Sequence, residues 1–390
     1  MNYLTPEVIK NKKVLIRVDF NVEIDKEGKI VDDFRIQKTL PTIKFLKENG
    51  AKRIVIISHL GQPKLEDFFS KEFSLEPVAK YLQEKLKEKI HFISLKDYKE
   101  IKQAIKKFEK GEIVLLENIR FFKEEEENDE EFAKELAKLG DIYINEAFSV
   151  SHRKAASLVK ITEFLPSYAG FLLEEEIKNL NEYLEAKSNS LVLILGGAKV
   201  EDKLPLIEKF LDRAKYILLG GVMANTFLKG WGFEIGKSVI EEKMIEKARN
   251  LGSKKAELIL PGDLYVLDKK GERKIRDFAA VKTNDIIVDI GKVAAEFYKR
   301  IIKETELVFF NGPMGKIEDE RFQEGTLKIL EGIIEKKVGK AIIGGGDTLK
   351  SLKIINFKFS FSNSVFLSTG GGAMLKYLAG EKLPALEVLN

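Results

Sequence analysis

Short apolar segments rich in β-branched residues alternate with longer amphipathic segments along the whole chain. Examples of the apolar segments are KVLIRVDF at 13–20 and RIVIIS at 53–58, and an amphipathic segment at 32–50 lies between them. This alternation is typical of βαβ units, and strands buried on both faces of a parallel sheet are almost continuously apolar. The sequence therefore predicts an α/β fold with parallel sheets flanked by helices.

The length of the chain favours two domains. Its 390 residues exceed what one hydrophobic core usually supports. A charged helical stretch separates two series of strand-like segments, and we interpret it as a connecting helix. The expected parts are an N-terminal lobe at 1–171, the connecting helix at 172–190, a C-terminal lobe at 191–372 and a C-terminal segment at 373–390.

Composition excludes several classes of function. The net charge is only +4, from 66 basic and 62 acidic residues, so a nucleic-acid partner is not favoured. The chain has no Cys, which excludes thiol nucleophiles and Cys-based metal sites. The first residues do not resemble a signal peptide, and no run of about 18 apolar residues could span a membrane. We expect a cytoplasmic enzyme without a membrane partner.

Polar residues occupy one face of the first predicted strand. In RVDFN, a period of two places Arg17, Asp19 and Asn21 on the same face. Such groups are costly in a buried strand unless they are paired. Two interpretations stay open here: a satisfied structural network, or a polar ligand bound at the carboxyl end of the strand.

Arginine usage favours an anion site in the first half. Only five Arg precede residue 190 in this Lys-rich chain, and we place four of them at strand exits or in the turns that follow. Arg grips carboxylate and phosphate groups in a bidentate way, although a surface ion pair remains the alternative for each one. His59 stands at another strand exit, in SHLGQP, where ligand contact is favoured. The acidic run at 124–131 we interpret as a solvated helix start.

Glycine-rich strand exits mark the second half. They include LVLILGGAK, FFNGPMGK, AIIGGGDTLK and LSTGGGAM, and none is a GxGxxG motif. The single GKS triplet has Trp231 where a P-loop needs Gly, so a P-loop is excluded. Glycines allow close backbone approach, and the following helices direct N–H groups at an anion. These turns together predict a site for nucleotide phosphates.

The ordered set of motifs makes the chain recognisable. SHLG, LLENIRF, INEAFSVSHR, GGAKVEDK, FNGPMG, IIGGGDT and STGGGA follow one another in the sequence. The chain resembles phosphoglycerate kinases along its whole length. The resemblance implies two Rossmann-like lobes joined by a hinge helix, with phosphoglycerate bound by the first lobe and the magnesium nucleotide by the second. It also implies lobe closure, a C-terminal segment that returns to the first lobe, and a monomer.

The resemblance implies roles for individual residues. The residues expected to bind 3-phosphoglycerate or 1,3-bisphosphoglycerate are Asp19, Phe20, Asn21, Arg35, His59, Leu60, Gly61, Gln62, Arg120 and Arg153. Those expected to bind ADP or ATP are Lys199, Lys203, Gly221, Gly291, Asn311, Pro313, Glu318, Gly345, Gly346, Asp347 and Thr348. Asp347 is expected to meet Mg²⁺. Arg35, Lys199 and the N–H groups of Gly371 and Gly372 are expected to act on the transferring phosphoryl group.

The implied activity is reversible phosphoryl transfer between 1,3-bisphosphoglycerate and ADP, giving 3-phosphoglycerate and ATP. The alternatives are a catalytically weak relative that binds nucleotides or anions, and a dehydrogenase, which the lack of GxGxxG disfavours. The chain departs from the family pattern at four positions, which are Glu23, Gln62, Lys292 and Phe366. Gln62 replaces a usual Arg, so we expect weaker anion binding. Phe366 replaces a His that commonly pairs with the hinge residue Glu176, which puts the usual hinge coupling in doubt.

Overall fold

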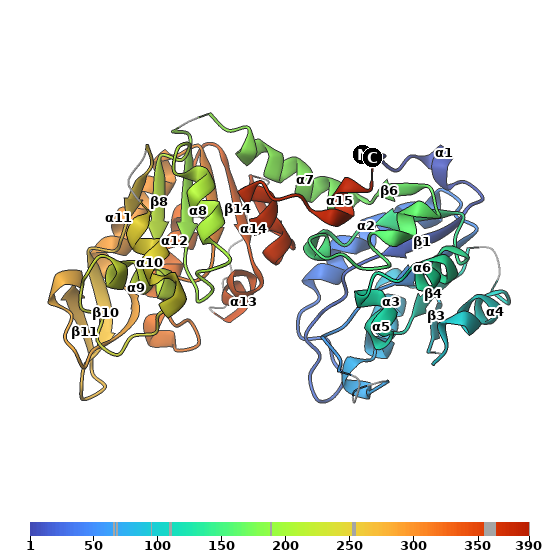
Figure 1. Ribbon diagram of the computed structural model, residues 1–390, viewed down its shortest axis with the longest axis horizontal. Coiled ribbons are helices and arrows are strands. Elements are labelled where there is room, and N and C mark those ends of the chain that lie inside the picture. Colours follow the sequence, from blue (N-terminus) through green and yellow to red (C-terminus); the bar gives the residue numbers. More distant parts are fainter. Residues whose placement is uncertain are drawn as a thin grey trace. The chain divides into compact units, whose positions relative to one another are not determined.

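The computed structural model forms two compact units, residues 1–178 with 382–390 (unit 1) and residues 179–381 (unit 2) (Figure 1). The division falls within helix α7 (Phe171–Leu184). The residues that the structure describes are 1–64, 67, 69–94, 96–108, 111–187, 189–251, 255–354 and 364–389. Among them, no helix is long and apolar enough to cross a membrane.

Unit 1 contains a six-stranded sheet in the order β3-β4-β2-β1-β5-β6, and every pair of neighbours is parallel. Its strands are β1 (Lys13–Arg17), β2 (Arg53–Ile57), β3 (Ile90–Ile93), β4 (Ile113–Leu116), β5 (Ile142–Asn145) and β6 (Ser167–Ala169). The central strands β1, β2 and β4 are buried along almost their whole length, as expected of strands covered on both faces. The parallel order brings the ends of β1, β2, β4 and β5 to one edge of the sheet.

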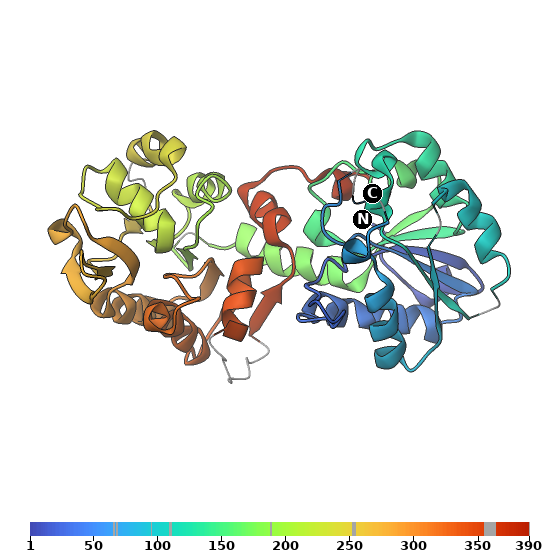
Figure 2. The same cartoon turned by 90° about the horizontal axis from the view of Figure 1, so that it is seen from below.

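Helices cover both faces of this sheet. Ile36 and Ile43 of α2 (Phe34–Glu48) and Val78 of α3 (Glu76–Leu86) join Val14 and Ile16 of β1 in one core cluster. On the other face, α6 (Glu130–Ala137) lies beside β3 and β4, as Figure 2 shows. The remaining helices of unit 1 are α1 (Pro6–Ile9), α4 (Ile101–Ile105), α5 (Lys123–Glu126) and α15 (Pro384–Glu387).

Of the expected C-terminal segment at 373–390, the part from residue 382 onward packs within unit 1, whereas residues 373–381 belong to unit 2. Ala385 of α15 lies in a small core cluster with Ala147 and Leu158, and its N–H donates to the carbonyl of Ser151 at 3.1 Å. The N–H of Asn2 donates to the carbonyl of Leu389 at 3.3 Å, so the two ends of the chain lie together (Figure 1).

Unit 2 contains a second six-stranded parallel sheet, in the order β15-β14-β13-β7-β8-β9. Its strands are β7 (Leu191–Leu195), β8 (Tyr216–Leu219), β9 (Glu257–Ile259), β13 (Leu307–Asn311), β14 (Lys340–Gly344) and β15 (Val365–Ser368). The two parallel sheets confirm the predicted α/β class. A three-stranded antiparallel sheet, which the sequence did not predict, is formed by β10 (Asp263–Leu267), β11 (Arg273–Asp277) and β12 (Ile286–Ile290).

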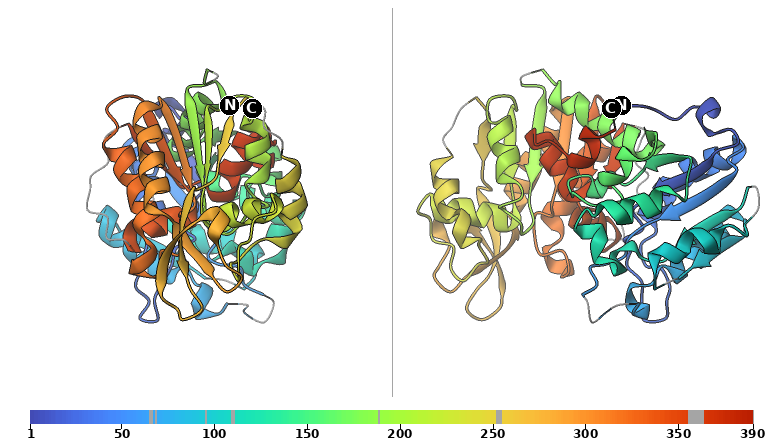
Figure 3. Two further views of the ribbon diagram at one scale, coloured as in Figure 1. Left: turned by 90° about the vertical axis from the view of Figure 1, so that its left-hand side faces the viewer. Right: turned by 45° about the vertical axis from the view of Figure 1, so that its right-hand side comes forward.

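Helices also cover both faces of the second parallel sheet. Tyr298 of α11 (Lys292–Glu304) and Ile329 of α12 (Glu324–Ile334) pack in one core cluster with Val192 and Phe310 of the sheet. Helices α8 (Leu204–Phe210) and α14 (Gly371–Ala379) lie on the other face (Figure 3, left). The other helices are α9 (Gly221–Gly230), α10 (Ile245–Asn250) and α13 (Gly346–Ile354).

Two of the departures from the family pattern have clear places in the fold. Lys292 is the first residue of α11, a position where Pro is favoured but not required. Phe366 is buried in β15, where it pairs with Ile342 of β14.

Candidate active site

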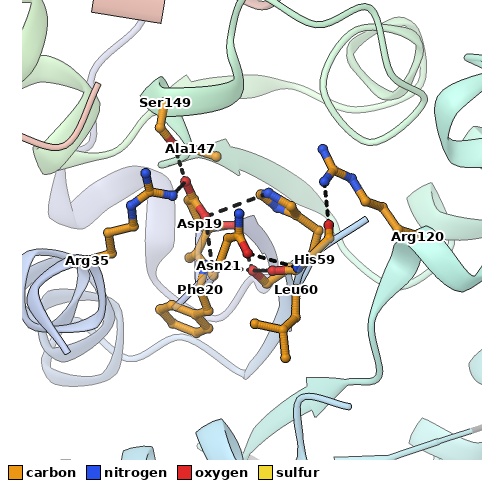
Figure 4. Close-up of polar contacts among 12 residues, drawn as sticks. Asp19, Phe20, Asn21, Arg35, His59, Leu60, Arg120, Ala147 and Ser149 are labelled. Carbon is orange, nitrogen blue, oxygen red and sulfur yellow. Dashed lines mark hydrogen bonds and ion pairs between the residues drawn. The ribbon is translucent and has the colours of Figure 1, made fainter. Parts of the chain in front are cut away.

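Asp19, which follows β1, is the centre of a polar network at the strand ends of unit 1 (Figure 4). Its carboxylate accepts hydrogen bonds from Arg35 Nη1, from the hydroxyl of Ser149, and from the N–H of Asn21 at 2.9 Å. Burial alone would raise the pKa of Asp19, but the charge of Arg35 and the hydrogen bonds from Ser149 and Asn21 hold it well below its usual value. Asp19 is therefore ionised at every pH near neutrality and fixes the position of Arg35.

His59, at the exit of β2, is buried and uncharged. Its Nδ1 lies 3.2 Å from Arg17 Nη2, and its Nε2 lies 3.8 Å from the Asp19 carboxylate. Burial lowers the pKa of His59 well below its usual value, and three neighbouring arginines lower it further against the opposing effect of Asp19. Beside it, Asn21 Oδ1 accepts the N–H of Gly61 at 2.8 Å. The loops after β1 and β2 are thus joined by side-chain contacts.

A basic cavity of about 300 Å³ adjoins this network. Among the residues that line it are Arg17, Gln62, Arg120, Glu126, Arg153 and Lys154. Arg120 Nη1 donates to the carbonyl of Gly61 at 2.7 Å. Burial lowers the pKa of Arg120 to about 10, and the charges of Arg153 and Arg17 contribute to the shift. The Nε of Arg153 is buried and has no hydrogen-bond partner within the described ranges. Crowded cations with an unused donor suit a small anion such as phosphate.

The structure places every predicted substrate residue at this edge of unit 1. Phe20 and Leu60 are buried and take part through their backbone: the N–H of Phe20 donates to Ser58 Oγ, and Asn118 Nδ2 donates to the carbonyl of Leu60. Gln62 is exposed and lines the basic cavity with Arg153. The roles of these residues in binding stay predictions.

Several residues of this site were not among the predicted ones, and Glu126 of the cavity wall is one of them. Arg17 donates through Nε to Ser157 Oγ at 2.9 Å and lies near Glu125, while Ser149 holds Asp19. The polar face of β1 already indicated Arg17. Ser149 follows β5 closely enough to have been a candidate by the same strand-exit argument. Glu125 lies in the acidic run, and it is buried rather than solvated because Ser157 donates to it through both its N–H and its hydroxyl. Nothing in the sequence indicated Lys154 as a site residue except its place next to Arg153.

In unit 2 a larger cavity, of about 590 Å³, lies at the strand ends of the parallel sheet and beside the antiparallel sheet. Its walls include apolar side chains such as Leu264, Val288 and Met314. Of the predicted nucleotide residues, those that line it are Gly221, Pro313, Glu318 and Asp347. A large cavity whose walls combine apolar side chains with charged ones such as Lys316, Glu318 and Asp347 suits a nucleotide.

The glycines of unit 2 divide into two groups. A Cβ on Gly312 would lie 2.2 Å from the carbonyl oxygen of Gly196, and one on Gly221 would lie 2.8 Å from the N of Gly197. These glycines allow neighbouring strand exits to pack backbone against backbone. Gly346, Gly371 and Gly372 are different, because a Cβ on any of them would meet no atom of the described residues within 4 Å. Their N–H groups open helices α13 and α14 and are free to face a phosphate.

The remaining predicted nucleotide residues do not line the cavity. Asn311 Nδ2 donates to the carbonyl of Gly344 at 2.8 Å, and Thr348 Oγ1 accepts the N–H of Gly312 at 2.7 Å. A Cβ on Gly345 would lie 2.5 Å from Asn311 Nδ2. These three residues therefore hold the FNGPMG and GGGDT turns together.

Gly291 packs against the carboxylate of Asp263, which accepts the N–H groups of Val293 and Ala294 at the start of α11. This arrangement explains the glycine by packing and does not itself indicate a ligand.

Two lysines belong to this region: Lys199 is the last residue of the GGAK turn, and Lys203 follows it. Lys203 is buried, and burial lowers its pKa to about 8, with the charge of Lys199 adding to the shift and that of Asp347 opposing it. Lys199 is exposed, and its amine has no ion-pair or hydrogen-bond partner in the part of the chain that the structure describes. A bound phosphate would relieve the crowding of Lys203 and give Lys199 a partner.

The residues present fit a magnesium ion that is held mainly by its nucleotide. No cluster of three or more His, Cys, Asp or Glu within the described ranges could hold a metal by itself. Mg²⁺ commonly takes only one or two carboxylates together with substrate phosphates. Asp347 offers one exposed carboxylate in the first turn of α13, at the wall of the larger cavity.

Comparison with known proteins agrees with this geometry. The profile of the phosphoglycerate kinase family matches residues 5–381. The phosphoglycerate kinase of Coprothermobacter proteolyticus is 42% identical over 389 residues, which cover 98% of this chain and 96% of that protein. The chain belongs to the phosphoglycerate kinase family.

Two solved phosphoglycerate kinases share its fold. The crystal structure from Pyrococcus horikoshii OT3 has a TM-score of 0.86 and 36% identity, and the match covers 100% of this chain and 98% of that one. The structure from Coxiella burnetii has a TM-score of 0.83 and 37% identity, covering 98% and 96%. The resemblance predicted from the motifs is confirmed, and both cavities lie within the range that the phosphoglycerate kinase profile matches.

Proposed function

We propose that the chain transfers a phosphoryl group reversibly between 1,3-bisphosphoglycerate and ADP, giving 3-phosphoglycerate and ATP. Unit 1 would bind the phosphoglycerate through the Asp19 network and the basic cavity. Unit 2 would bind the nucleotide in the larger cavity. The observation that carries the proposal is the anion site of unit 1, where Arg120 and Arg153 line the basic cavity and Asp19 holds Arg35 in the adjoining network. Among the described residues of this site we identify none suited to act as a general base.

The lack of a base agrees with the chemistry. In the direction of ATP use, the nucleophile is the carboxylate of 3-phosphoglycerate, which is already ionised at neutral pH. His59 is held neutral by burial and lies between Arg17 and Asp19, so its part is to bind and orient the substrate. Catalysis then depends on positioning and on stabilising the charge of a loose transition state.

Three groups are proposed to stabilise the transferring phosphoryl group. Asp19 holds Arg35 in place, so its guanidinium is oriented before the substrate arrives. Lys199 is exposed and its amine lacks a partner within the described ranges, which leaves its charge available. The open N–H groups of Gly371 and Gly372 are donors at the start of α14.

Asp347 is the proposed protein ligand for the magnesium that accompanies the nucleotide. When bound, the ion would neutralise part of the charge on the phosphates. The buried Lys203 would add a positive charge nearby, since its electrostatic coupling to Asp347 opposes the fall in its pKa. Glu318 lines the same cavity and would meet the ribose.

A coupled assay with 3-phosphoglycerate, ATP and Mg²⁺ tests the proposal. We expect ADP formation that requires 3-phosphoglycerate and stops when the magnesium is chelated. The absence of ADP formation from protein shown to be folded by circular dichroism would overturn the proposed activity. It would favour the alternative, a relative that binds nucleotides or anions without turnover.

A further inference from the structure

Two oppositely charged side chains line the basic cavity of unit 1 and have no role in the proposed reaction so far. Lys154 directly follows Arg153 on the loop after β5, and Glu126 ends helix α5. Both line the same cavity as Gln62, Arg120 and Arg153. Their charges therefore act directly on any anion bound there.

Lys154 is an exposed cation without a counter-ion. No hydrogen bond or ion pair joins its amine to another residue of the described part of the chain. Nearby lysines differ in this respect, because Lys123 pairs with Glu127 and Lys160 pairs with Glu163. Position 62, on another wall of the cavity, carries the neutral Gln62. The cavity thus has a free positive charge on the β5 side and none at the exit of β2.

Glu126 is the counter-ion that faces the two arginines. Its Oε1 lies 3.7 Å from Arg120 Nε and 3.9 Å from Arg153 Nη1, and its side chain is 52% exposed. These distances are too long for good hydrogen bonds, so the pairs are weak and screened by solvent. The preceding residue, Glu125, is fixed by Ser157. Glu126 is thereby held near the arginines without closing on them.

We propose that Lys154 and Glu126 set the affinity of this cavity for a phosphate group. Lys154 supplies the positive charge that position 62 lacks. Glu126 balances Arg120 and Arg153 while the cavity is empty, and the phosphate of the substrate displaces it. The buried Nε of Arg153, which lacks a partner in the described structure, becomes available to the incoming oxygen. The weakening expected from Gln62 alone is offset by Lys154.

The inference rests on the proposed function for the identity of the phosphate ligand, so its test begins with binding rather than turnover. Calorimetric titration with sodium sulfate and with 3-phosphoglycerate measures the cavity directly. Lys154→Ala should weaken binding of both ligands about fivefold, because one charge-assisted contact is lost. Glu126→Gln should tighten both about threefold, because a competing carboxylate is removed.

Matched controls separate these effects from a general change of surface charge. Lys44→Ala removes an exposed cation on α2, and Glu127→Gln makes the same substitution one residue beyond Glu126. Neither should change the dissociation constants beyond error. Adding Gln62→Arg to Lys154→Ala should restore most of the lost affinity, which a merely structural role of Lys154 would not allow.

Kinetics provide the second readout. In the coupled assay Lys154→Ala should raise KM for 3-phosphoglycerate about fivefold, with kcat and KM for ATP unchanged, because the contact is made equally before and during transfer. If Lys154→Ala binds sulfate and 3-phosphoglycerate as the Lys44→Ala control does, the inference is wrong, whether or not the enzyme turns over. If the binding changes occur as expected but no ADP forms even in the unmodified chain, the proposed function fails and the inference about the cavity stands.

Discussion

The two cavities are lined by different kinds of groups. In unit 1 the candidate substrate site is made of charged side chains that hold one another, with Asp19 joining Arg35, Ser149 and His59. In unit 2 the cavity has apolar side chains and backbone turns in its walls. The exposed Lys199, which does not line the cavity, has no ion-pair or hydrogen-bond partner for its amine among the described residues. A small anion offers little surface beyond its charges, whereas a nucleotide brings a large apolar base that walls can bury.

This difference determines how substitutions should act. In unit 1 the charges are coupled, so removal of one member leaves others buried and unpaired. In unit 2 an exposed charge can be removed without consequences for the fold. Changes in the Asp19 network of unit 1 should therefore alter stability and binding together, and removal of an exposed charge such as Lys199 in unit 2 should separate the two.

Lys199→Ala is expected to have the largest effect, on catalysis alone. Loss of a charge that acts on the transferring group should lower kcat about a thousandfold, while KM for ATP changes less than about threefold. Thermal unfolding should not change, since the Lys199 amine has no partner in the described structure. Lys229→Ala, an exposed residue of α9, is the matched control and should retain full activity. A kcat close to that of the unmodified chain would remove Lys199 from the mechanism.

Asp19→Ala should instead damage stability and binding together. It leaves Arg35, Ser149 and His59 without their common partner, and loss of one member of a buried ion pair costs about 3 kcal/mol. We expect a urea unfolding transition that begins at lower urea concentration, measured by circular dichroism. We also expect a higher KM for 3-phosphoglycerate. The control Glu163→Ala removes only an exposed pair with Lys160 and should change stability by less than about 0.5 kcal/mol. Full stability in Asp19→Ala would contradict the coupled description of unit 1.

Both parallel sheets and part of the candidate site could be predicted from the sequence. The apolar segments indicated both parallel sheets because strand burial depends on local composition, and Asp19, His59 and Arg120 followed from their places at strand exits. The antiparallel sheet was not predictable in the same way. Its strand β11 is charged and mostly exposed, and it is held by pairing with β10 rather than by an apolar pattern.

The burial of Glu125 and the different surroundings of the glycines could not be predicted from the sequence either. Glu125 looks like its acidic neighbours, and only the partner Ser157, far along the chain, distinguishes it. Likewise Gly312 and Gly346 are equivalent in sequence, and their difference arises from what lies next to them after folding.

Two buried carboxyl groups, Asp289 and Asp19, should change the stability in opposite directions in a pH titration. Burial raises the pKa of Asp289, at the wall of the larger cavity, from 3.8 to about 7, with Glu324 adding to the shift and the N–H groups of Gly325 and Ile290 opposing it. The folded unit then binds a proton that the unfolded chain releases, so unit 2 should lose stability as pH rises from about 4 to 7. The expected change is on the order of 2 to 4 kcal/mol. Asp19, whose pKa is lowered, contributes in the other direction, with stability lost only at strongly acidic pH.

Trp231 is the only Trp of the chain and lies in unit 2, so its fluorescence can follow unfolding of that unit. Urea midpoints at pH 5 and pH 7.5 should differ in the unmodified chain. The difference should largely disappear in Asp289→Asn, which cannot titrate. An equal pH dependence in both proteins would show that Asp289 is not the titrating group.

Two glycine substitutions in unit 2 should separate an effect on stability from an effect on nucleotide binding. Gly312→Ala would bring its Cβ to 2.2 Å from the carbonyl oxygen of Gly196, at a φ of +91° that a side chain rarely adopts. We expect a loss of about 2 kcal/mol in the free energy of unfolding, measured through Trp231. Gly346→Ala adds a methyl group into open space at the first turn of α13, so stability should change by less than about 0.5 kcal/mol. Its effect should fall on nucleotide affinity, because the methyl group occupies the approach to the N–H groups that open the helix. Equal destabilisation by both substitutions would mean that the turn after β14 is as closely packed as the turn after β13, and the distinction between closed and open glycines would then have no functional meaning.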